Sequence, residues 1–352
     1  MFSSVAMDRF SKKQDPVILQ YGAAKGFTGF RQEVAKFVAV LYTCSINATH
    51  PDTFMVTTGN SQAISHSAMT FSKTKKLVFV EEPTYFLNHG IFRELGLNLE
   101  GIYSRKDGID LDSLEERLMR GDVPAFLYTI QFFHNPTGAV LSSDRCKRLV
   151  GLAQNYGFHI ISDEPYKLYH INGSAVPPLA SYDDSELVVS LGSFSKILAP
   201  GLCLGWAQTS EKRSKSCRQL VFFVVVVVKI LSLQHSFIAC VSSSQGCHVR
   251  CSAQILSGRD VYRAVWRIFF GYFVWLRLLD GIHTDLLLKE AATRHSVMFT
   301  PATRCSLYSG CDNDMRTSSR LLQWVRFSFA FYSEDEIRIG IEQFQKSLTS
   351  LK

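Results

Sequence analysis

The chain has 352 residues, of which 46% are hydrophobic, and 38 basic against 31 acidic residues give it a formal net charge of +7. This length supports one large domain with a smaller second one. The basic residues are scattered, and the one denser patch, 212–218, is interpreted as a solvated face. The composition therefore favours a globular protein and argues against a nucleic-acid-binding one.

Cysteine usage and the N-terminal segment indicate the compartment. The nine cysteines are an odd number at irregular spacing, which is typical of reduced thiols in an intracellular protein. Cys247 and Cys251 have no second cysteine pair at ligand spacing, so no metal site is predicted. Residues 1–16 have no long apolar segment, and the nine-residue apolar run 220–228 is too short to span a membrane. We expect a cytoplasmic protein, with the mitochondrion as the alternative, and no membrane partner.

Helical and extended patterns alternate along the first two hundred residues. Helices are predicted at 30–42, 63–71, 111–119 and 144–156, and strands at 54–57, 77–80, 99–103, 125–130, 158–161 and 187–191. Asp110 is the expected N-cap of the third helix, and Gly157 ends the fourth. The alternation predicts an α/β fold with a mainly parallel sheet and helices on both faces.

Five of the predicted strands are followed directly by a polar motif. The motifs are Thr58-Gly-Asn-Ser-Gln62, Glu81-Glu-Pro-Thr-Tyr85, Phe132-Phe-His-Asn-Pro-Thr-Gly138, Ser162-Asp-Glu-Pro-Tyr166 and Ser193-Phe-Ser-Lys196. Open α/β sheets bind their ligands at the carboxyl edge of the strands. Because five motifs converge on one edge, the sequence predicts a ligand site there.

Lys196 is the first candidate for chemistry in that site. It follows the buried strand 187–191 and Gly192, which allows a sharp turn. An apolar setting favours the neutral, nucleophilic amine that forms a Schiff base. The hydroxyls of Ser193 and Ser195 suit a phosphate, so one aldehyde with a phosphate tail would satisfy both features. On this stretch alone, an ordinary loop lysine is the alternative.

Taken together in this order, the motifs resemble the pyridoxal-phosphate-dependent aminotransferases of class I/II, and most closely the 2-aminoadipate-type subgroup. The resemblance covers 20–206 and resumes at 271. It implies a fold type I large domain that binds pyridoxal phosphate at 20–210 and a smaller C-terminal α/β domain at 271–352. The remaining parts are an N-terminal segment, 1–19, and a poorly matching segment, 211–270. It further implies amino acid and 2-oxo acid substrates and a homodimer with shared active sites.

The resemblance also implies a role for each site residue. Lys196 would be the Schiff-base lysine and proton shuttle, Asp163 would pair with the pyridine nitrogen, and Tyr85 would stack on the ring. Asn135 and Tyr166 would hydrogen-bond the ring oxygen, and Asn135 would also contact the substrate. The expected phosphate ligands are Gly59, Asn60, Ser61, Gln62, Ser193, Ser195 and, from the other subunit of the dimer, Tyr21.

Two features depart from the family pattern. Cys203 stands where the family has a phosphate-binding arginine, and a thiol lacks that planar, charged donor set. We therefore expect weakened cofactor binding. From about 210 to 270 the resemblance nearly vanishes, and the apolar run 220–228 is β-prone and aggregation-prone. We interpret this segment as retained intron or frameshifted sequence.

The residue expected to bind the substrate carboxylate is Arg326. It stands directly before the strand-like Phe327-Ser-Phe-Ala-Phe331, and this adjacency sets the direction of its side chain. Arg316 is the alternative, because 312–316 also resembles the usual lead-in and 317–325 then looks inserted.

The predicted reaction is a ping-pong transamination between an L-amino acid and a 2-oxo acid. One alternative is a catalytically impaired paralogue or a defective gene product that keeps the fold. Another is a different reaction on the same scaffold, such as β-elimination or decarboxylation, because the fold does not fix the reaction. A third is the aminotransferase-like domain of a bacterial-type regulator, which the lack of a helix-turn-helix pattern before residue 20 disfavours.

Overall fold

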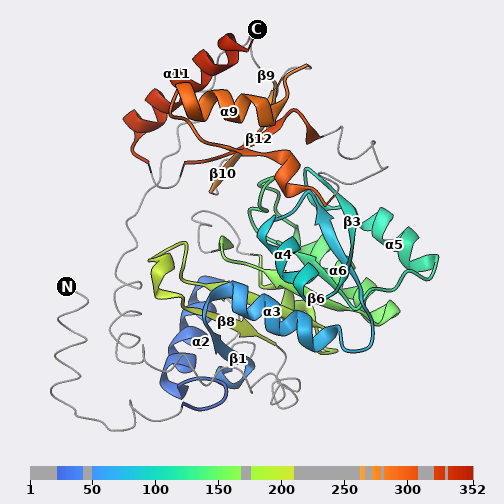
Figure 1. Ribbon diagram of the computed structural model, residues 1–352. Coiled ribbons are helices and arrows are strands. Elements are labelled where there is room, and N and C mark those ends of the chain that lie inside the picture. The colour runs from blue at the N-terminus through green and yellow to red at the C-terminus, as the bar shows by residue number, and fades with distance from the viewer. Residues whose placement is uncertain are drawn as a thin grey trace, which may run out of the picture. The chain divides into compact units, whose positions relative to one another are not determined.

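The computed structural model describes residues 22–42, 50–167, 176–209, 262–265, 272–278, 281–307, 321–329 and 332–351 (Figure 1). The chain divides into two compact units, one formed by 1–78, 115–129 and 142–248, and the other by 79–114, 130–141 and 249–352. These units interleave along the sequence, and the domain boundaries expected from the sequence stay a prediction. Tyr21 and Arg316 lie outside the described residues.

An eight-stranded sheet has the order β1-β8-β7-β6-β5-β2-β3-β4. Its strands are β1 (Phe54–Thr57), β2 (Leu77–Glu82), β3 (Asn98–Arg105), β4 (Gly108–Ile109), β5 (Phe126–Thr129), β6 (His159–Asp163), β7 (Val188–Ser193) and β8 (Gly205–Gln208). β5, β6 and β7 pair in parallel, whereas β8 pairs antiparallel with β7 and with β1. β5 and β7 are buried along their whole length, in keeping with their mainly apolar or small residues. The predicted α/β fold is confirmed.

Two of the five helices of this α/β part have the cap residues expected from the sequence. They are α2 (Thr28–Tyr42), α3 (Gly59–Phe71), α4 (Leu87–Glu94), α5 (Leu111–Met119) and α6 (Ser143–Tyr156). The Asp110 carboxylate accepts hydrogen bonds from the backbone N–H groups of Asp112 and Ser113 at the start of α5. Gly157 ends α6 with a φ of +70°, a conformation that glycine adopts without strain. Short 3-10 helices lie at η3 (Pro51–Thr53), η5 (Leu179–Tyr182), η6 (Pro200–Leu202) and η10 (Ala302–Cys305).

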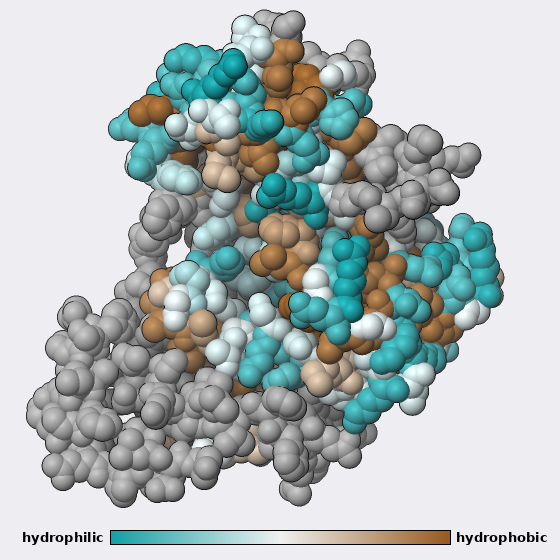
Figure 2. Space-filling model, in the orientation of Figure 1, coloured by the Kyte–Doolittle hydropathy of each residue, from teal (hydrophilic) through white to brown (hydrophobic). Residues whose placement is uncertain are grey.

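The second sheet lies in the C-terminal part of the chain and has the order β11-β12-β10-β9. It is antiparallel and contains β9 (Tyr262–Val265), β10 (Phe273–Leu278), β11 (Thr300–Pro301) and β12 (Trp324–Ser328). α9 (Thr284–Arg294) and α11 (Glu334–Ser350) pack on it through a core that includes Leu276, Leu287, Val325 and Phe344. Hydrophilic side chains gather over the outward side of α11 in Figure 2. This part is the predicted smaller α/β domain.

β9 belongs to the segment 211–270, which the sequence analysis interprets as anomalous. Its Val265 and Ala264 pair with Leu276 and Arg277 of β10, so these residues take part in the fold. The rest of that segment lies outside the described residues. Within the part of the chain that the structure describes, no helix is long and apolar enough to cross a membrane.

Candidate active site

The turn between β1 and α3 presents backbone amides to an open space. Gly59, the first residue of α3, has a φ of +72°, and a Cβ built on it would meet no heavy atom within 4 Å. Thr58, the N-cap, makes no side-chain cap hydrogen bond to the helix. The first N–H groups of a helix lack intrahelical partners and attract anions. The predicted phosphate ligands Gly59, Asn60 and Ser61 therefore lie together at a helix N-terminus.

The side chain of Gln62, also predicted as a phosphate ligand, contacts the turn itself. Its Oε1 accepts a hydrogen bond of 2.7 Å from the backbone N–H of Thr58. This hydrogen bond closes the turn between β1 and α3. The Gln62 carbonyl oxygen therefore holds the loop in shape.

Asp163, the last residue of β6, is the centre of a buried polar cluster. One carboxylate oxygen accepts from Asn60 Nδ2 at 2.5 Å and the other from the Tyr128 hydroxyl at 2.7 Å. The residue is only 4% exposed, and burial raises the pKa of its carboxyl to about 6 against the opposing effect of these hydrogen bonds. A buried carboxyl of this kind is suited to a cationic partner.

Lys196 lies in the turn after β7 and is half-buried. Its charge is close enough to lower the pKa of Asp163. Gly192, just upstream, is required by packing, because a Cβ there would overlap the indole ring of Trp206. The structure thus brings the predicted lysine, the predicted aspartate and Asn60 into one neighbourhood.

Ser193 and Ser195 form the frame of the lysine loop. The Ser193 hydroxyl donates to the Leu204 carbonyl at 3.1 Å and accepts from the Ser195 N–H at 3.1 Å, and the two hydroxyl oxygens are 2.9 Å apart. The Ser193 hydroxyl is therefore engaged inside the loop. Tyr166, also predicted for the site, is buried in the turn that follows Asp163.

Tyr128 is a site residue that the sequence analysis missed. It pairs with Ile161 in the β5–β6 ladder, two positions before Asp163, and is fully buried. A buried tyrosine hydroxyl usually requires a hydrogen-bond partner. The signal was a tyrosine in the middle of an otherwise apolar strand, but only the strand register identifies its partner.

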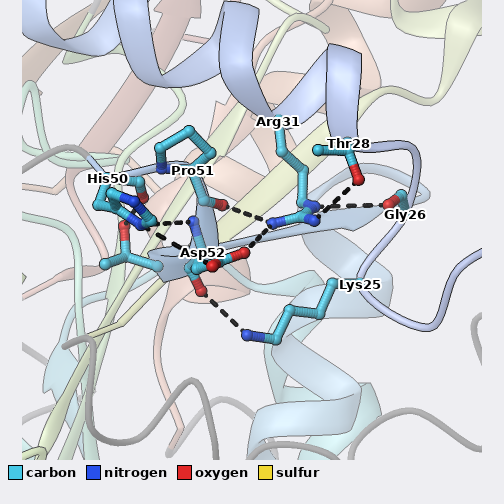
Figure 3. A network of polar contacts seen from close by, with 8 residues as sticks. Lys25, Gly26, Thr28, Arg31, His50, Pro51 and Asp52 are labelled. Atoms are coloured by element: carbon cyan, nitrogen blue, oxygen red, sulfur yellow. Dashed lines mark hydrogen bonds and ion pairs between the residues drawn. The ribbon is translucent and has the colours of Figure 1, made fainter.

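A network around Arg31 fixes the entrance to β1 (Figure 3). Its guanidinium donates to the Pro51 carbonyl at 2.8 Å, to Asp52 Oδ1 at 2.9 Å and to Thr28 Oγ1 at 3.2 Å. On the other side, the carbonyl of Lys25 accepts from the N–H of Val56 in β1 at 3.0 Å. The start of α2 and the segment before it are thereby tied to the strand that ends at the α3 turn.

Cys203 occupies the C-terminal end of η6 in a left-handed conformation, with a φ of +49°. The residue is exposed, and its Sγ lies 3.6 Å from the Pro200 carbonyl oxygen. A thiol in this position supplies no positive charge to the lysine loop.

In the second unit, Arg326 of β12 meets the predicted residue Asn135. Its Nη1 donates to Asn135 Oδ1 at 2.7 Å, and its Nη2 donates to Thr300 Oγ1 at 2.9 Å. Tyr85 is half-buried, and its ring packs edge-on against Phe86 with 5.5 Å between centroids. The predicted residues Asn135 and Arg326 thus contact each other, and Thr300, which the sequence did not single out, is the second partner of Arg326.

Glu81 braces the loop that carries Asn135. Its carboxylate accepts from the Ile130 N–H at 2.9 Å and from the Ser104 hydroxyl at 2.8 Å, and one oxygen lies 3.4 Å from His134 Nε2. His134 Nδ1 is 2.9 Å from the Thr137 hydroxyl, and burial lowers the pKa of the imidazole. This network fixes both sides of Asn135. No group of His, Cys, Asp or Glu within the described ranges is arranged to hold a metal ion.

Comparison with known proteins identifies relatives of this chain. Residues 3–263 match the model of the family described as aminotransferase class I and II. The chain is 28% identical over 346 residues to aromatic-amino-acid aminotransferase 1 of Thermococcus litoralis, covering 94% of this chain and 80% of the relative. It is 27% identical over 363 residues to 2-aminoadipate transaminase of Thermus thermophilus, covering 98% and 85%.

A solved structure supports the same assignment. The alpha-aminoadipate aminotransferase of Thermus thermophilus, complexed with N-(5'-phosphopyridoxyl)-L-leucine, matches with a TM-score of 0.82 and 26% identity, covering 99% of this chain and 88% of that one. The sheet and this similarity place the chain among the pyridoxal-phosphate-dependent enzymes of fold type I. Within that class, the chain belongs to the class I and II aminotransferases. The predicted family, its 2-aminoadipate-type subgroup and the cofactor, pyridoxal phosphate, are confirmed.

Proposed function

We propose that this aminotransferase transfers the amino group of an L-amino acid to a 2-oxo acid in a ping-pong reaction, with Lys196 as the covalent attachment point of the cofactor. The observation that carries the proposal is the placement of Lys196 beside the buried Asp163, which Asn60 and Tyr128 hold by hydrogen bonds. A nucleophilic amine and a buried carboxylate are the two groups that this chemistry requires from the protein.

The residues present fit pyridoxal phosphate. Asn60 Oδ1 is buried without a hydrogen-bond partner, and the Asp163 carboxyl beside it has its pKa raised to about 6 by burial, so this position favours a protonated ring nitrogen. The open space above Gly59 and the N-terminal amides of α3 suit a phosphate. When bound, the cofactor supplies an aldehyde for the amino group and a ring that withdraws electrons.

Each site residue then has a proposed task. The Asp163 carboxylate would hold the protonated ring nitrogen of the cofactor, and the Lys196 amine would move a proton to and from the substrate carbon. Ser195 and the amides of Gly59, Asn60 and Ser61 bind the phosphate, while Ser193 and Gln62 hold their loops in place. For the second unit, the proposed tasks are ring stacking by Tyr85 and binding of the substrate carboxylate by Arg326 with Asn135.

The quaternary structure and the substrates are proposed at the level of the family. A homodimer with shared active sites follows the expectation that Tyr21 serves the neighbouring site. The relatives point to aromatic or 2-aminoadipate-like amino acids as the first donors to test. A cytoplasmic location, with the mitochondrion as the alternative, stays a prediction.

A half-reaction assay tests the proposed function directly. Purified protein saturated with pyridoxal phosphate is mixed with each member of an amino-acid panel, and the visible absorbance of the lysine-bound cofactor is recorded. We expect at least one amino acid to remove this absorbance and a 2-oxo acid to restore it. A panel without any response, in protein that does bind the cofactor, would contradict transamination.

Cys203 supports a second candidate, a catalytically impaired relative with weak cofactor binding. Its exposed thiol offers no charge where the family pattern has an arginine. We expect Cys203→Arg to tighten pyridoxal phosphate binding by about 10- to 100-fold, because charge-assisted hydrogen bonds contribute about 1.5 to 3 kcal/mol. The left-handed backbone strains cysteine and arginine alike, so the comparison isolates the side chain.

Fluorescence titration with pyridoxal phosphate measures this change, and Cys203→Gln is the matched control for a long polar side chain without charge. Equal affinities of the wild type and both variants would show that no cation is missing at this position. A wild-type protein that binds the cofactor tightly would count against the impaired candidate.

A further inference from the structure

Arg326 carries a positive charge, and the side chains that accept its hydrogen bonds do not neutralise it. The two side chains that accept its hydrogen bonds, Asn135 and Thr300, are both neutral. No carboxylate in the described residues pairs with the guanidinium, and its Nε is buried without a hydrogen-bond partner. A guanidinium has five N–H groups, so Nη1 and Nη2 each keep a second N–H group for an anion.

The ring of Phe273 covers one face of this guanidinium. The Arg326 Cζ lies 4.3 Å from the Phe273 ring centroid, compared with 6.0 Å from that of Phe86. Arg326 stands directly opposite Trp275 in the β10–β12 ladder, so Phe273, two residues away, is its diagonal neighbour on the same face. The contact is therefore set by the strand register, and Phe273 is only 6% exposed.

We propose that Phe273 is a positioning residue for the substrate: its ring holds the plane of the Arg326 guanidinium so that the remaining N–H groups meet the substrate carboxylate. This inference rests on the proposed function of Arg326. A guanidinium binds a carboxylate within its own plane, through two parallel hydrogen bonds. A ring stacked on one face restricts the rotation of that plane and excludes water from it without occupying any N–H group.

The test compares Phe273→Leu with Phe273→Tyr in the cofactor-loaded enzyme. Leucine keeps an apolar side chain but removes the ring face, so KM for both the amino acid and the 2-oxo acid is expected to rise about 3- to 30-fold. The visible absorbance of the bound cofactor and kcat are expected to stay unchanged. Tyrosine keeps the ring face and is expected to retain the wild-type KM values. Phe86→Leu, at the longer distance, is the matched control with the smaller effect.

Two further measurements separate a positioning role from a structural one. In an Arg326→Gln background, Phe273→Leu is expected to have no additional effect, because the ring acts through the guanidinium. Calorimetric titration of the cofactor-loaded enzyme with 2-oxoglutarate gives the same comparison without turnover. If the wild type binds 2-oxoglutarate but transaminates no amino acid, the proposed function fails, and the calorimetry still tests Phe273.

Three outcomes would overturn the inference. The first is an unchanged KM and an unchanged affinity for 2-oxoglutarate in Phe273→Leu. The second is an equal effect of Phe273→Leu with and without Arg326, or a loss of cofactor absorbance that accompanies it. The third is a wild-type enzyme that neither turns over nor binds 2-oxoglutarate.

Discussion

Lys196→Ala is expected to lower transamination by about 10⁴-fold, since a positioned acid–base group alone contributes about 10² to 10⁴ in rate. The variant also loses the amine that attaches the cofactor covalently. Borohydride is therefore expected to fix pyridoxal phosphate to the wild type but not to the variant. Because Lys196 is half-buried in a turn, its truncation is expected to leave the sheet and its helices intact.

Mass spectrometry of the reduced protein gives the readout, as a gain of one cofactor mass on the peptide that contains Lys196. Lys36→Ala is the matched control, because Lys36 is an exposed lysine that pairs with Glu33 on α2. Cofactor fixed to Lys196→Ala in the same amount as to the wild type would show that another lysine is the attachment point.

The sequence predicts Lys196 and Asp163 as site residues because Lys196 follows a buried strand and Asp163 ends one, and strand ends of an α/β sheet collect at one edge. Glycines helped at Gly59 and Gly192, since the structure requires a small residue or a positive φ there. These signals lie in neighbouring residues, so they can be recognised in a single sequence. Element boundaries followed from the same signals, with the start of α3 shifted to the glycine itself.

The contacts that depend on register could not be predicted. Tyr128 reaches Asp163 only because β5 and β6 align in parallel, and Phe273 reaches Arg326 only through the β10–β12 ladder. The short strand β8 was missed because four residues that include Gly205 carry little periodicity. Likewise, residue type predicts Ser193 and Gln62 as phosphate ligands, and only the structure shows that Ser193 Oγ and Gln62 Oε1 make hydrogen bonds within their own loops.

The two polar clusters of the chain differ in how they hold charge. Around Asp163, a negative group is buried and its pKa rises, so it favours a ligand that brings a positive charge. Around Arg326, a positive group has neutral partners and favours a ligand that brings a negative charge.

Asp163→Asn is expected to lower kcat/KM by about 10² to 10⁴-fold, because breaking a buried charge pair costs about 3 to 5 kcal/mol. The asparagine has nearly the same shape, and the Tyr128 hydroxyl can accept a hydrogen bond as well as donate one. The loss would therefore reflect the missing charge opposite the ring nitrogen. Asp144→Asn, at an exposed aspartate, is the matched control.

The same variant is expected to stabilise the cofactor-free protein at neutral pH. The pKa of Asp163 is about 6 in the folded chain, above its ordinary value of 3.8, so the folded state binds this proton more tightly. The resulting stability is fully present below pH 3.8 and is lost as the pH rises through 6. That loss amounts to about 3 kcal/mol, from about 2.2 pH units at 1.36 kcal/mol each.

Because asparagine does not titrate, the difference in unfolding free energy between variant and wild type should grow by up to this amount between pH 4 and pH 7.5. Urea unfolding of the cofactor-free proteins at both pH values measures the difference. With pyridoxal phosphate bound, we expect the wild type to be more stable than the variant, because the protonated ring nitrogen then pairs with the buried carboxylate. If the cofactor-free variant gains no stability relative to the wild type as the pH rises, another group of the protein already stabilises the ionised Asp163 carboxylate. That result would contradict the proposed task of Asp163 at the ring nitrogen.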